Sequence, residues 1–255
     1  MPYDDNGHGT HCAGCIAADG RCSAGRYQGI APNANLVVVK VLNRYGHGAL
    51  SDVISGIDWC IEHKDIYRIR ILSMSIGSQA LEPPDEDPVV QAVERAWAAG
   101  IFVVTAAGNE GPGLGTVATP GISSTVVTVG AGEGRLKEGV AAFSSRGPTI
   151  HGALKPDVIA PGVNIISLRA PRSFQDKFGQ RDRRDGAYFN ATGTSMATPI
   201  VAGIAAQLLE KAPALTPDEL KTLLCQSCET MELPSSTEGH GLINAEQALA
   251  TLSKK

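Results

Sequence analysis

A glycine-bearing turn that leads into a long apolar helix is the feature that most constrains this chain. The turn spans residues 190–199, with the sequence NATGTSMATP. Apolar residues recur after it at helical spacing, namely Ala197, Ile200, Val201, Ile204 and Leu208. Ser195 should therefore lie where the turn enters the helix, among unpaired N–H groups that favour negative charge. By itself, the stretch fits an ordinary Ser or Thr N-cap on a buried helix equally well.

Two further motifs precede this stretch, and the three together carry a resemblance. Residues 5–14 read DNGHGTHCAG, and residues 105–111 read TAAGNEG. In this order, with GTSMA at residues 193–197, they resemble the subtilisin family of serine proteases. Shorter matches at residues 75–77, 160–162 and 241–245 extend the resemblance over nearly the whole chain. Residues 2–8 and the six cysteines are similar to the intracellular bacterial branch of that family.

The expected fold follows from the alternation of strands and helices. The pattern and the resemblance both imply one α/β domain over residues 1–255, with the subtilisin-like three-layer fold: a mostly parallel central sheet and helices on both faces. Apolar runs predict strands at residues 36–42, 69–76, 101–105, 125–129, 158–160 and 163–166. Helices are expected at residues 8–18, from about residue 51 to about residue 61, and from Pro88 to Gly100. Two more should follow Thr216 and Asn244. Ser51, Asp87, Thr216 and Asn244 are the predicted N-caps. Residues 169–185, with six Lys or Arg and three Asp, indicate a solvated loop.

Composition excludes several classes of partner. The net charge of −4 argues against a nucleic-acid surface, and no apolar run reaches membrane-spanning length. Two of the cysteine pairs, Cys12/Cys15 and Cys225/Cys228, have C-x-x-C spacing, so a four-thiolate zinc site is conceivable. Their helical, apolar surroundings favour buried free thiols and no metal. Unpaired thiols indicate a reducing, cytoplasmic location, although an N-terminus that looks incomplete leaves secretion open.

Ser195 needs a base to accept its proton, and a base that titrates near neutral pH is usually histidine. His8 and His11 are the candidates. The resemblance selects His8 as the general base and leaves His11 as a packed structural residue. A metal site at these two histidines is disfavoured, because their separation of three is not the best spacing for two ligands on one helical face.

Asn109 is the candidate for oxyanion stabilisation, because it follows a predicted strand and two small residues. The resemblance implies that its amide acts together with the N–H of Ser195. Without the other motifs, Asn109 would be read as a turn residue in the sequence GNEG.

The resemblance also implies a substrate cleft. Two segments would pair with an extended peptide: Gly46, His47 and Gly48, and Ser75, Ile76 and Gly77. Ala106, Ala107 and Gly108 would wall the primary specificity pocket, with Ala118 near its floor, leaving room for a large apolar side chain. The Thr119–Pro120 peptide is expected to be cis. No cofactor is required by this chemistry, and structural calcium is possible, although residues 19–29 contain few oxygen ligands.

The chain departs from the family pattern in one respect. Subtilisins carry the triad aspartate on an interior strand well before the histidine motif, whereas only seven residues precede His8 here. Asp4 and Asp5 are too close in sequence to reach the far ring nitrogen, so we assign no catalytic aspartate. We therefore expect the fold to lack an N-terminal strand and the endopeptidase to have impaired activity. The expected partners are a peptide or protein substrate and a complementing N-terminal segment.

The motifs leave two alternatives to the peptidase. An inactive peptide-binding or interaction module on the same fold would explain the missing aspartate, but it would not need His8, Asn109 and Ser195 together. An esterase of the α/β-hydrolase type is disfavoured, because residues 193–197 lack the second glycine of G-x-S-x-G and the histidine precedes the serine.

Overall fold

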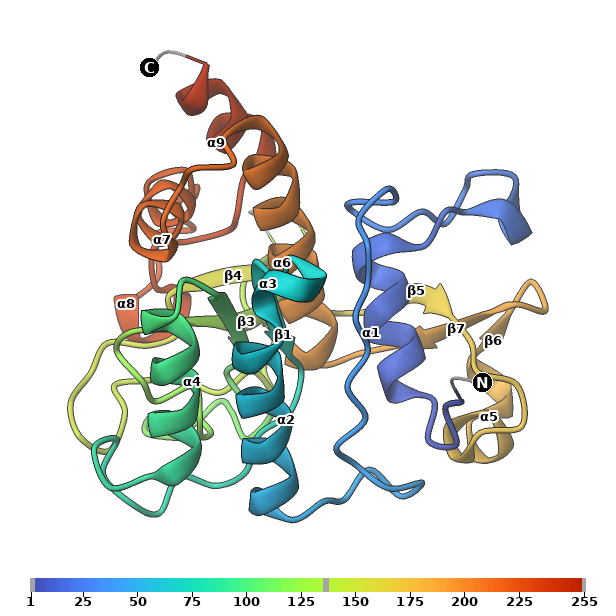
Figure 1. The fold of residues 1–255 in the computed structure, drawn as a ribbon, viewed down its shortest axis with the longest axis horizontal. Helices are drawn as coiled ribbons and strands as arrows, with labels where there is room; N and C mark the ends of the chain where they lie inside the picture. The colour runs from blue at the N-terminus through green and yellow to red at the C-terminus, as the bar shows by residue number, and fades with distance from the viewer. Residues whose placement is uncertain (1–2, 135–137, 254–255) are drawn as a thin grey trace.

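A parallel four-stranded sheet organises the molecule. The computed structural model describes residues 3–134 and 138–253. In this part of the chain, the strands β1 (Ile71–Met74), β2 (Phe102–Ala106), β3 (Val127–Gly132) and β4 (Val158–Pro161) pair in chain order (Figure 1). All residues of β2 and β3 are buried, as expected for parallel strands covered on both faces.

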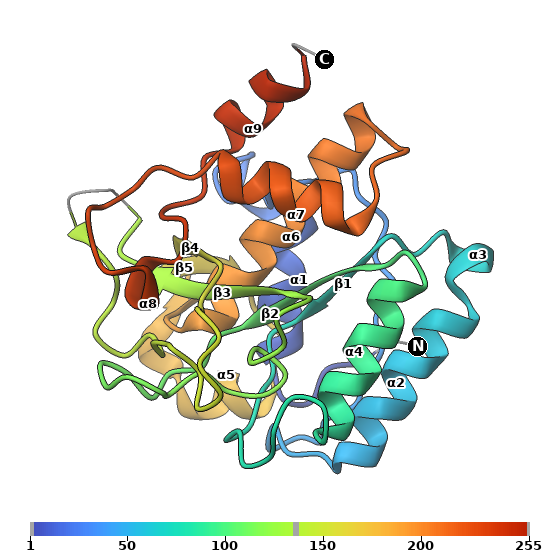
Figure 2. The same ribbon diagram turned by 90° about the vertical axis from the view of Figure 1, so that its left-hand side faces the viewer.

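Helices cover both faces of this sheet, so the predicted three-layer fold is confirmed. Helix α6 (Thr194–Lys211) contacts all four strands on one face, and α1 (His8–Ala17) packs on α6. On the other face, α4 (Pro88–Ala98) packs on β2, and α2 (Leu50–Glu62) packs on α4 (Figure 2). The remaining α-helices outside this core arrangement are α3 (Lys64–Tyr67), α5 (Phe174–Phe178), α7 (Pro217–Gln226), α8 (Ser235–Glu238) and α9 (Ala245–Leu252).

A small antiparallel sheet includes part of residues 169–185, for which the sequence predicted a solvated loop. Strands β5 (Ile165–Leu168) and β6 (Arg183–Arg184) flank β7 (Tyr188–Ala191), and residues 169–185 contribute α5, a 3-10 turn and β6. The prediction of an irregular loop was wrong. The buried Asp176 orders the segment by accepting hydrogen bonds from Arg169 (2.7 Å), Arg183 (2.7 Å) and the Arg172 N–H (2.8 Å).

Three of the predicted helix caps are confirmed and one is wrong. Asp87 accepts from the N–H groups of Val89 and Val90, Thr216 forms a complete capping box, and Asn244 accepts from the Gln247 N–H. Ser51 lies inside α2, which begins at Leu50 after Ala49. The error is local, because α2 covers the predicted apolar positions.

The predicted strand at residues 36–42 is also wrong. The segment is extended but makes no ladder, and Leu36 and Val38 are 44% and 74% exposed. Figure 1 shows it as a plain trace that runs beside α1 toward α2. A strand needs a neighbour for its N–H and C=O groups, and β1 pairs only with β2 in the described sheet. The apolar run therefore has strand composition without a strand partner.

The contact between α6 and the loop before residue 31 generates a stability prediction. A Cβ atom on Gly203 would lie 2.5 Å from Ile30 Cβ. Gly→Ala inside a helix ordinarily stabilises it by about 1 kcal/mol. We expect Gly203→Ala to lower the free energy of unfolding by about 1–3 kcal/mol instead, because overpacking outweighs propensity. Urea denaturation measures this loss. In an Ile30→Gly background, which removes Ile30 Cβ, the same substitution should lose most of its cost, and an unchanged cost there would contradict the assigned contact.

Candidate active site

The N-terminus of α6 holds Ser195 against the segment that follows β2. Thr194 and Ser195 are the first two residues of α6. The carboxamide oxygen of Asn109 accepts hydrogen bonds from the Thr194 N–H (2.9 Å) and the Thr194 hydroxyl (3.1 Å). A Cβ on Gly193 would lie 3.6 Å from Asn109 Nδ2, so the amide faces the turn that leads to Ser195. Asn109 and Ser195 therefore share one location.

This location offers unpaired hydrogen-bond donors. Within residues 3–134 and 138–253, neither the Ser195 N–H nor Asn109 Nδ2 has a hydrogen-bond acceptor. The two bonds to Oδ1 fix the amide and leave its NH₂ group free to donate. Together with the dipole of an 18-residue helix, these donors favour an anionic oxygen beside Ser195.

His8 is the first residue of α1, and Cys12 connects it to Ser195. Both ring nitrogens of His8 lie 3.9 Å from Cys12 Sγ, and the Cys12 thiol donates to the Ser195 carbonyl (3.4 Å). Among the described residues, no hydrogen bond joins the Ser195 hydroxyl to His8. The hydroxyl donates instead to the Ser75 carbonyl (3.2 Å), and the Ser75 hydroxyl donates to the Ser195 carbonyl (2.8 Å). Sequence reasoning missed Cys12, although its i+4 spacing puts it on the same helical face as His8.

The buried position of the His8 ring favours its neutral form. Burial lowers the pKa of His8, and the nearby negative charge of Asp4 opposes that shift. A neutral imidazole can accept a proton, which is the property a general base requires.

Neither aspartate near His8 bonds to its ring. Asp4 accepts hydrogen bonds from the N–H groups of Asn6, Gly7 and Thr10 and from the Thr10 hydroxyl, so it organises the first turn of α1. Burial opposes ionisation of Asp4, but these hydrogen bonds outweigh it and lower its pKa. Asp5 pairs with Lys40 at 2.9 Å. Among the described residues, the His8 ring has no carboxylate partner.

Part of the predicted substrate cleft lies close together around Ala118. A Cβ on Gly108 would lie 3.1 Å from Ala118 Cβ, and one on Gly77 would lie 3.2 Å from it. The Ala118 N–H donates to the carbonyl oxygen of the buried Ala107 (2.8 Å). Ala106 ends β2, and Ser75 and Ile76 follow β1. The Thr119–Pro120 peptide is cis, as predicted.

The other predicted cleft segment forms an exposed turn. Asn43 holds it, because its side chain accepts from the N–H groups of Tyr45 and His47 and its own N–H donates to the His47 carbonyl (2.7 Å). Gly46 lies in this turn, and Gly48 follows it. The Asn6 amide donates to the Arg44 carbonyl (3.0 Å), so the turn adjoins the residues that lead into His8.

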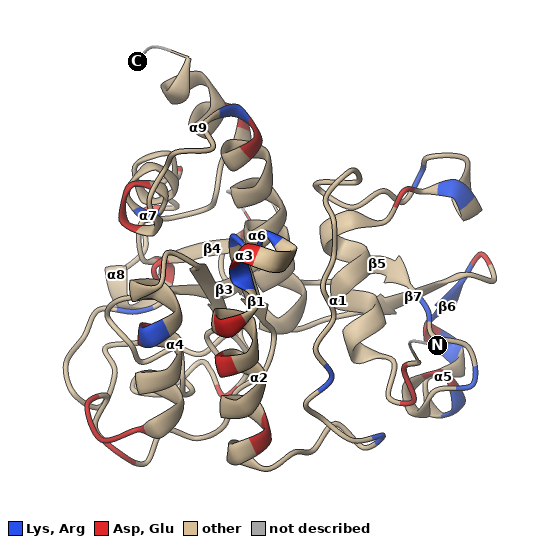
Figure 3. Cartoon of the chain, viewed as in Figure 1, with Lys and Arg blue, Asp and Glu red and all other residues tan. Residues whose placement is uncertain are grey.

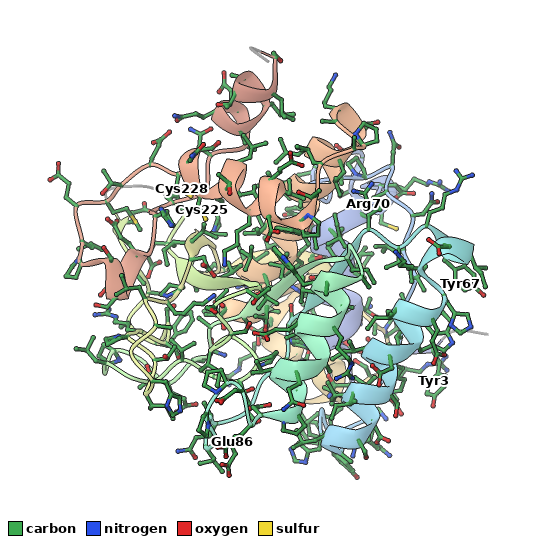
Figure 4. The ribbon with its side chains drawn as sticks, turned by 60° about the vertical axis from the view of Figure 1, so that its left-hand side comes forward. Tyr3, Tyr67, Arg70, Glu86, Cys225 and Cys228 are labelled. Carbon is green, nitrogen blue, oxygen red and sulfur yellow. The ribbon has the colours of Figure 1, made fainter. Side chains whose placement is uncertain are left out.

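The cysteines are free thiols distributed over different helices. All six are unpaired, and burial raises the pKa of Cys12 to about 12 and that of Cys15 to about 11. Cys225 and Cys228 lie near each other at the end of α7 (Figure 4). The prediction of burial is confirmed for Cys15, whereas Cys12, Cys225 and Cys228 are half-buried.

The part of the chain that the structure describes contains no group of three or more potential metal ligands, and Asp19 of the loop considered for calcium pairs with Arg21. No helix in that part has the length and apolar character of a membrane span.

His11 has a structural place, which generates a pH prediction. Its buried Nε2 lies 3.1 Å from the carbonyls of both Ile165 and Phe189, and burial lowers its pKa from 6.5 to about 4. Because the unfolded chain then binds a proton more readily than the folded chain, stability falls as the pH drops from 6.5 toward 4. The loss is about 1.4 kcal/mol per pH unit, or about 3 kcal/mol in all. Urea denaturation at several pH values in this range should show that the free energy of unfolding falls less steeply with pH for His11→Gln than for the parent chain. Identical pH slopes for the two proteins would contradict the assignment.

Comparison with known proteins agrees with the motifs and the fold. A family model described as the subtilase family of peptidases matches residues 1–247. Serine protease AprX of Bacillus subtilis (strain 168) is 51% identical over 259 residues, which cover 97% of this chain and 59% of AprX. Subtilisin DY of Bacillus licheniformis is 35% identical, covering 96% of this chain and 78% of that protein.

Solved structures give the same result. Sphericase superposes with a TM-score of 0.75 at 32% identity, covering 89% of this chain and 70% of that one. The S41 psychrophilic protease superposes with a TM-score of 0.78 at 29% identity, covering 94% and 78%. By sequence, motif order and fold, the chain belongs to the subtilase family of serine peptidases.

Proposed function

We propose that the protein is a serine endopeptidase that hydrolyses peptide bonds through an acyl-enzyme on Ser195. The observation that carries this proposal is the N-terminus of α6, where Ser195 lies beside two unpaired donors and, through Cys12, next to a neutral His8. Relatives named serine protease and subtilisin support the same chemistry.

The proposed reaction begins with a change of hydrogen bond at Ser195. Its hydroxyl leaves the Ser75 carbonyl and turns to His8, which takes the proton as Oγ attacks the substrate carbonyl carbon. His8 then gives that proton to the departing amine, and the acyl group remains on Oγ. A water molecule repeats the sequence, giving its proton to His8 and its oxygen to the acyl carbon, which releases the acid and restores Ser195.

Asn109 and the Ser195 N–H form the proposed oxyanion hole. The negative charge of each tetrahedral intermediate develops on the former carbonyl oxygen, which needs donors already aimed at it. Thr194 holds the Asn109 amide by its oxygen, so Nδ2 requires no reorganisation before it donates.

The proposed carboxylate side of the site is incomplete in the described residues. Asp4 and Asp5 are occupied elsewhere, and a histidine without a carboxylate partner is poorly oriented and poorly stabilised as a cation. We propose that activity is impaired until a further stretch of polypeptide supplies that carboxylate. The free edge of β1 and the unpaired residues 36–42 offer such a stretch hydrogen-bonding partners.

Substrate recognition is proposed to follow the family resemblance. Residues 46–48 and 75–77 would pair with an extended peptide, and the small residues Ala106, Ala107, Gly108 and Ala118 would shape the pocket for one side chain. The chemistry requires no cofactor, and calcium would have only a structural role. Six free thiols support the proposal of a reducing, cytoplasmic environment.

A second candidate function is a peptide-binding module without turnover. The absence of a carboxylate on His8 in the described part of the chain favours it, as does the Ser195 hydroxyl's bond to Ser75. The unpaired donors beside Ser195 favour the peptidase, because a binder has no oxyanion to stabilise.

Reaction of Ser195 with a fluorophosphonate tests the oxyanion hole. Asn109→Ala should slow labelling by about 10²–10³-fold, the scale established for such a donor within the subtilisin family. The exposed Asn33→Ala is the matched control and should label like the parent chain. Equal rates for Asn109→Ala and the parent would remove Asn109 from the site, and no labelling of any form under any condition would favour the binding module.

Complementation tests the carboxylate. A synthetic segment with an apolar strand that ends in Asp-x-Gly, added in trans, should raise both fluorophosphonate labelling and peptide turnover, because it supplies a partner for His8. The same segment with Asn for Asp should restore order without restoring the rate, and about 10⁴-fold in kcat is the scale known for removing the triad acid in this family. Full turnover by the chain alone would show that Asp4 or Asp5 serves as the carboxylate partner of His8.

A further inference from the structure

The α5 insertion, which we define as residues 169–185, lies directly against the residues that lead into His8. The Phe174 N–H donates to the Asp5 carbonyl (2.8 Å), and the Gln175 N–H donates to the Asn6 carbonyl (2.9 Å). A Cβ on Gly7 would lie 2.6 Å from Ser173 Oγ, so the two backbones approach closely. The insertion therefore lies beside the residues that lead into α1, and Figure 1 shows α5 near the start of that helix.

The insertion also reaches the turn at residues 43–47. The Phe174 ring meets the Tyr45 ring edge-on, with centroids 5.5 Å apart. Tyr45 belongs to the turn that Asn43 holds beside Asn6. A peptide that crosses the site between Ser195 and this turn would pass along the insertion.

The insertion is a cationic region on an acidic protein. It holds six Lys or Arg and three Asp, in a chain whose net charge is −4. Asp176 is shared by Arg169 and Arg183, and in the described structure no carboxylate pairs with Arg172, Lys177 or Arg181. Figure 3 shows the blue of these cations gathered around α5 and β6, with red at the tip of the loop before β7.

The cations are held on a rigid base with an apolar contact surface between them. Asp176 accepts hydrogen bonds from two guanidinium groups and from the Arg172 N–H, and Ser173 caps α5 by accepting from the Asp176 N–H. Phe178 is 77% exposed and packs on Phe174 at 4.7 Å between centroids. An ordered backbone that carries free cations beside an exposed ring presents both charge and apolar area to a partner, and the backbone need not be ordered on binding.

We propose that the α5 insertion selects substrates, favouring polypeptides that carry Asp or Glu within a few residues of the bond to be cleaved. The inference rests on the proposed function, because it assigns the substrate class of the same site. Free guanidinium and ammonium groups on the rim of a cleft attract carboxylates and give specificity more than raw affinity. Lys177 and Arg181 are the central residues, because they lie within three residues of the exposed Phe178 and, like Arg172, are exposed without a carboxylate partner in the described chain.

Binding to the Ser195→Ala variant tests this inference independently of turnover. Fluorescence anisotropy would compare a library of labelled octapeptides with matched peptides in which each Asp and Glu is replaced by Asn and Gln. The acidic peptides should bind about three- to tenfold more tightly at low salt, the scale of one or two exposed ion pairs. The preference should shrink as salt rises to 0.5 M, roughly, because screening shortens the range of exposed charges.

Two variants locate the effect. Lys177→Gln/Arg181→Gln should bring the ratio of the two affinities close to one. The matched control Arg68→Gln/Lys211→Gln removes two exposed cations from outside the insertion and should leave the ratio unchanged. The inference would be overturned if the Lys177→Gln/Arg181→Gln variant kept the affinity ratio of the parent. It would also be overturned if the parent bound acidic and amide peptides equally.

A nucleic acid is the competing ligand for a cationic surface. A fluorescent RNA oligonucleotide that binds through Lys177 and Arg181, and that an acidic peptide does not displace, would overturn the proposal. Failure of the proposed function is separable: absent fluorophosphonate labelling of Ser195 together with charge-selective peptide binding would contradict the peptidase and support the selecting surface.

Discussion

The packing of α6 across all four parallel strands is the constraint on which the rest of the structure depends. Parallel strands end at one edge of the sheet, and a helix that begins above that edge brings its N-terminal donors to the residues that follow the strands. Ser75 follows β1, Asn109 follows β2, and both bond to the first turn of α6. Helix α1 packs on α6, which brings His8 and Cys12 to the same place. The site is therefore a consequence of layer packing, and its residues need not be close in sequence.

The two sides of the site differ in how complete they are. On the side of Asn109, the amide oxygen accepts two hydrogen bonds from Thr194, and the NH₂ group has no acceptor among the described residues. On the side of His8, the ring contacts the thiol of Cys12, while Asp4 is bound to the first turn of α1. Residues 36–40 are exposed, and Lys40 reaches this second side by pairing with Asp5. Among the described residues, β1 thus lies at an edge of the sheet, and the His8 ring has no carboxylate partner.

The sequence predicted the elements whose signals are local, and it failed where partners decide the outcome. The capping box at Thr216 and the Asp87–Pro88 helix start are read from adjacent residues, and the structure confirms them. Residues 36–42 have strand composition, but a strand also needs a neighbour, which composition cannot supply. Asp176 orders residues 169–185 by binding arginines seven residues away on either side, a pairing that the sequence could not reveal because the segment has no continuous helical or strand pattern. The Ser195 hydroxyl's bond to Ser75 could not be predicted either, because the motif that places the hydroxyl does not specify its resting partner.

The central claim is that Ser195, Asn109 and His8 act on one bound carbonyl group. A crystal structure of the protein with a peptide boronic acid would test it most directly, since a tetrahedral boronate resembles the proposed intermediate. We predict a covalent bond from boron to Ser195 Oγ, one boronate oxygen within hydrogen-bond distance of Asn109 Nδ2 and the Ser195 N–H, and the His8 ring facing the other oxygen. A boronate attached at another residue, or attached to Ser195 with its oxygens directed away from Asn109, would contradict the account.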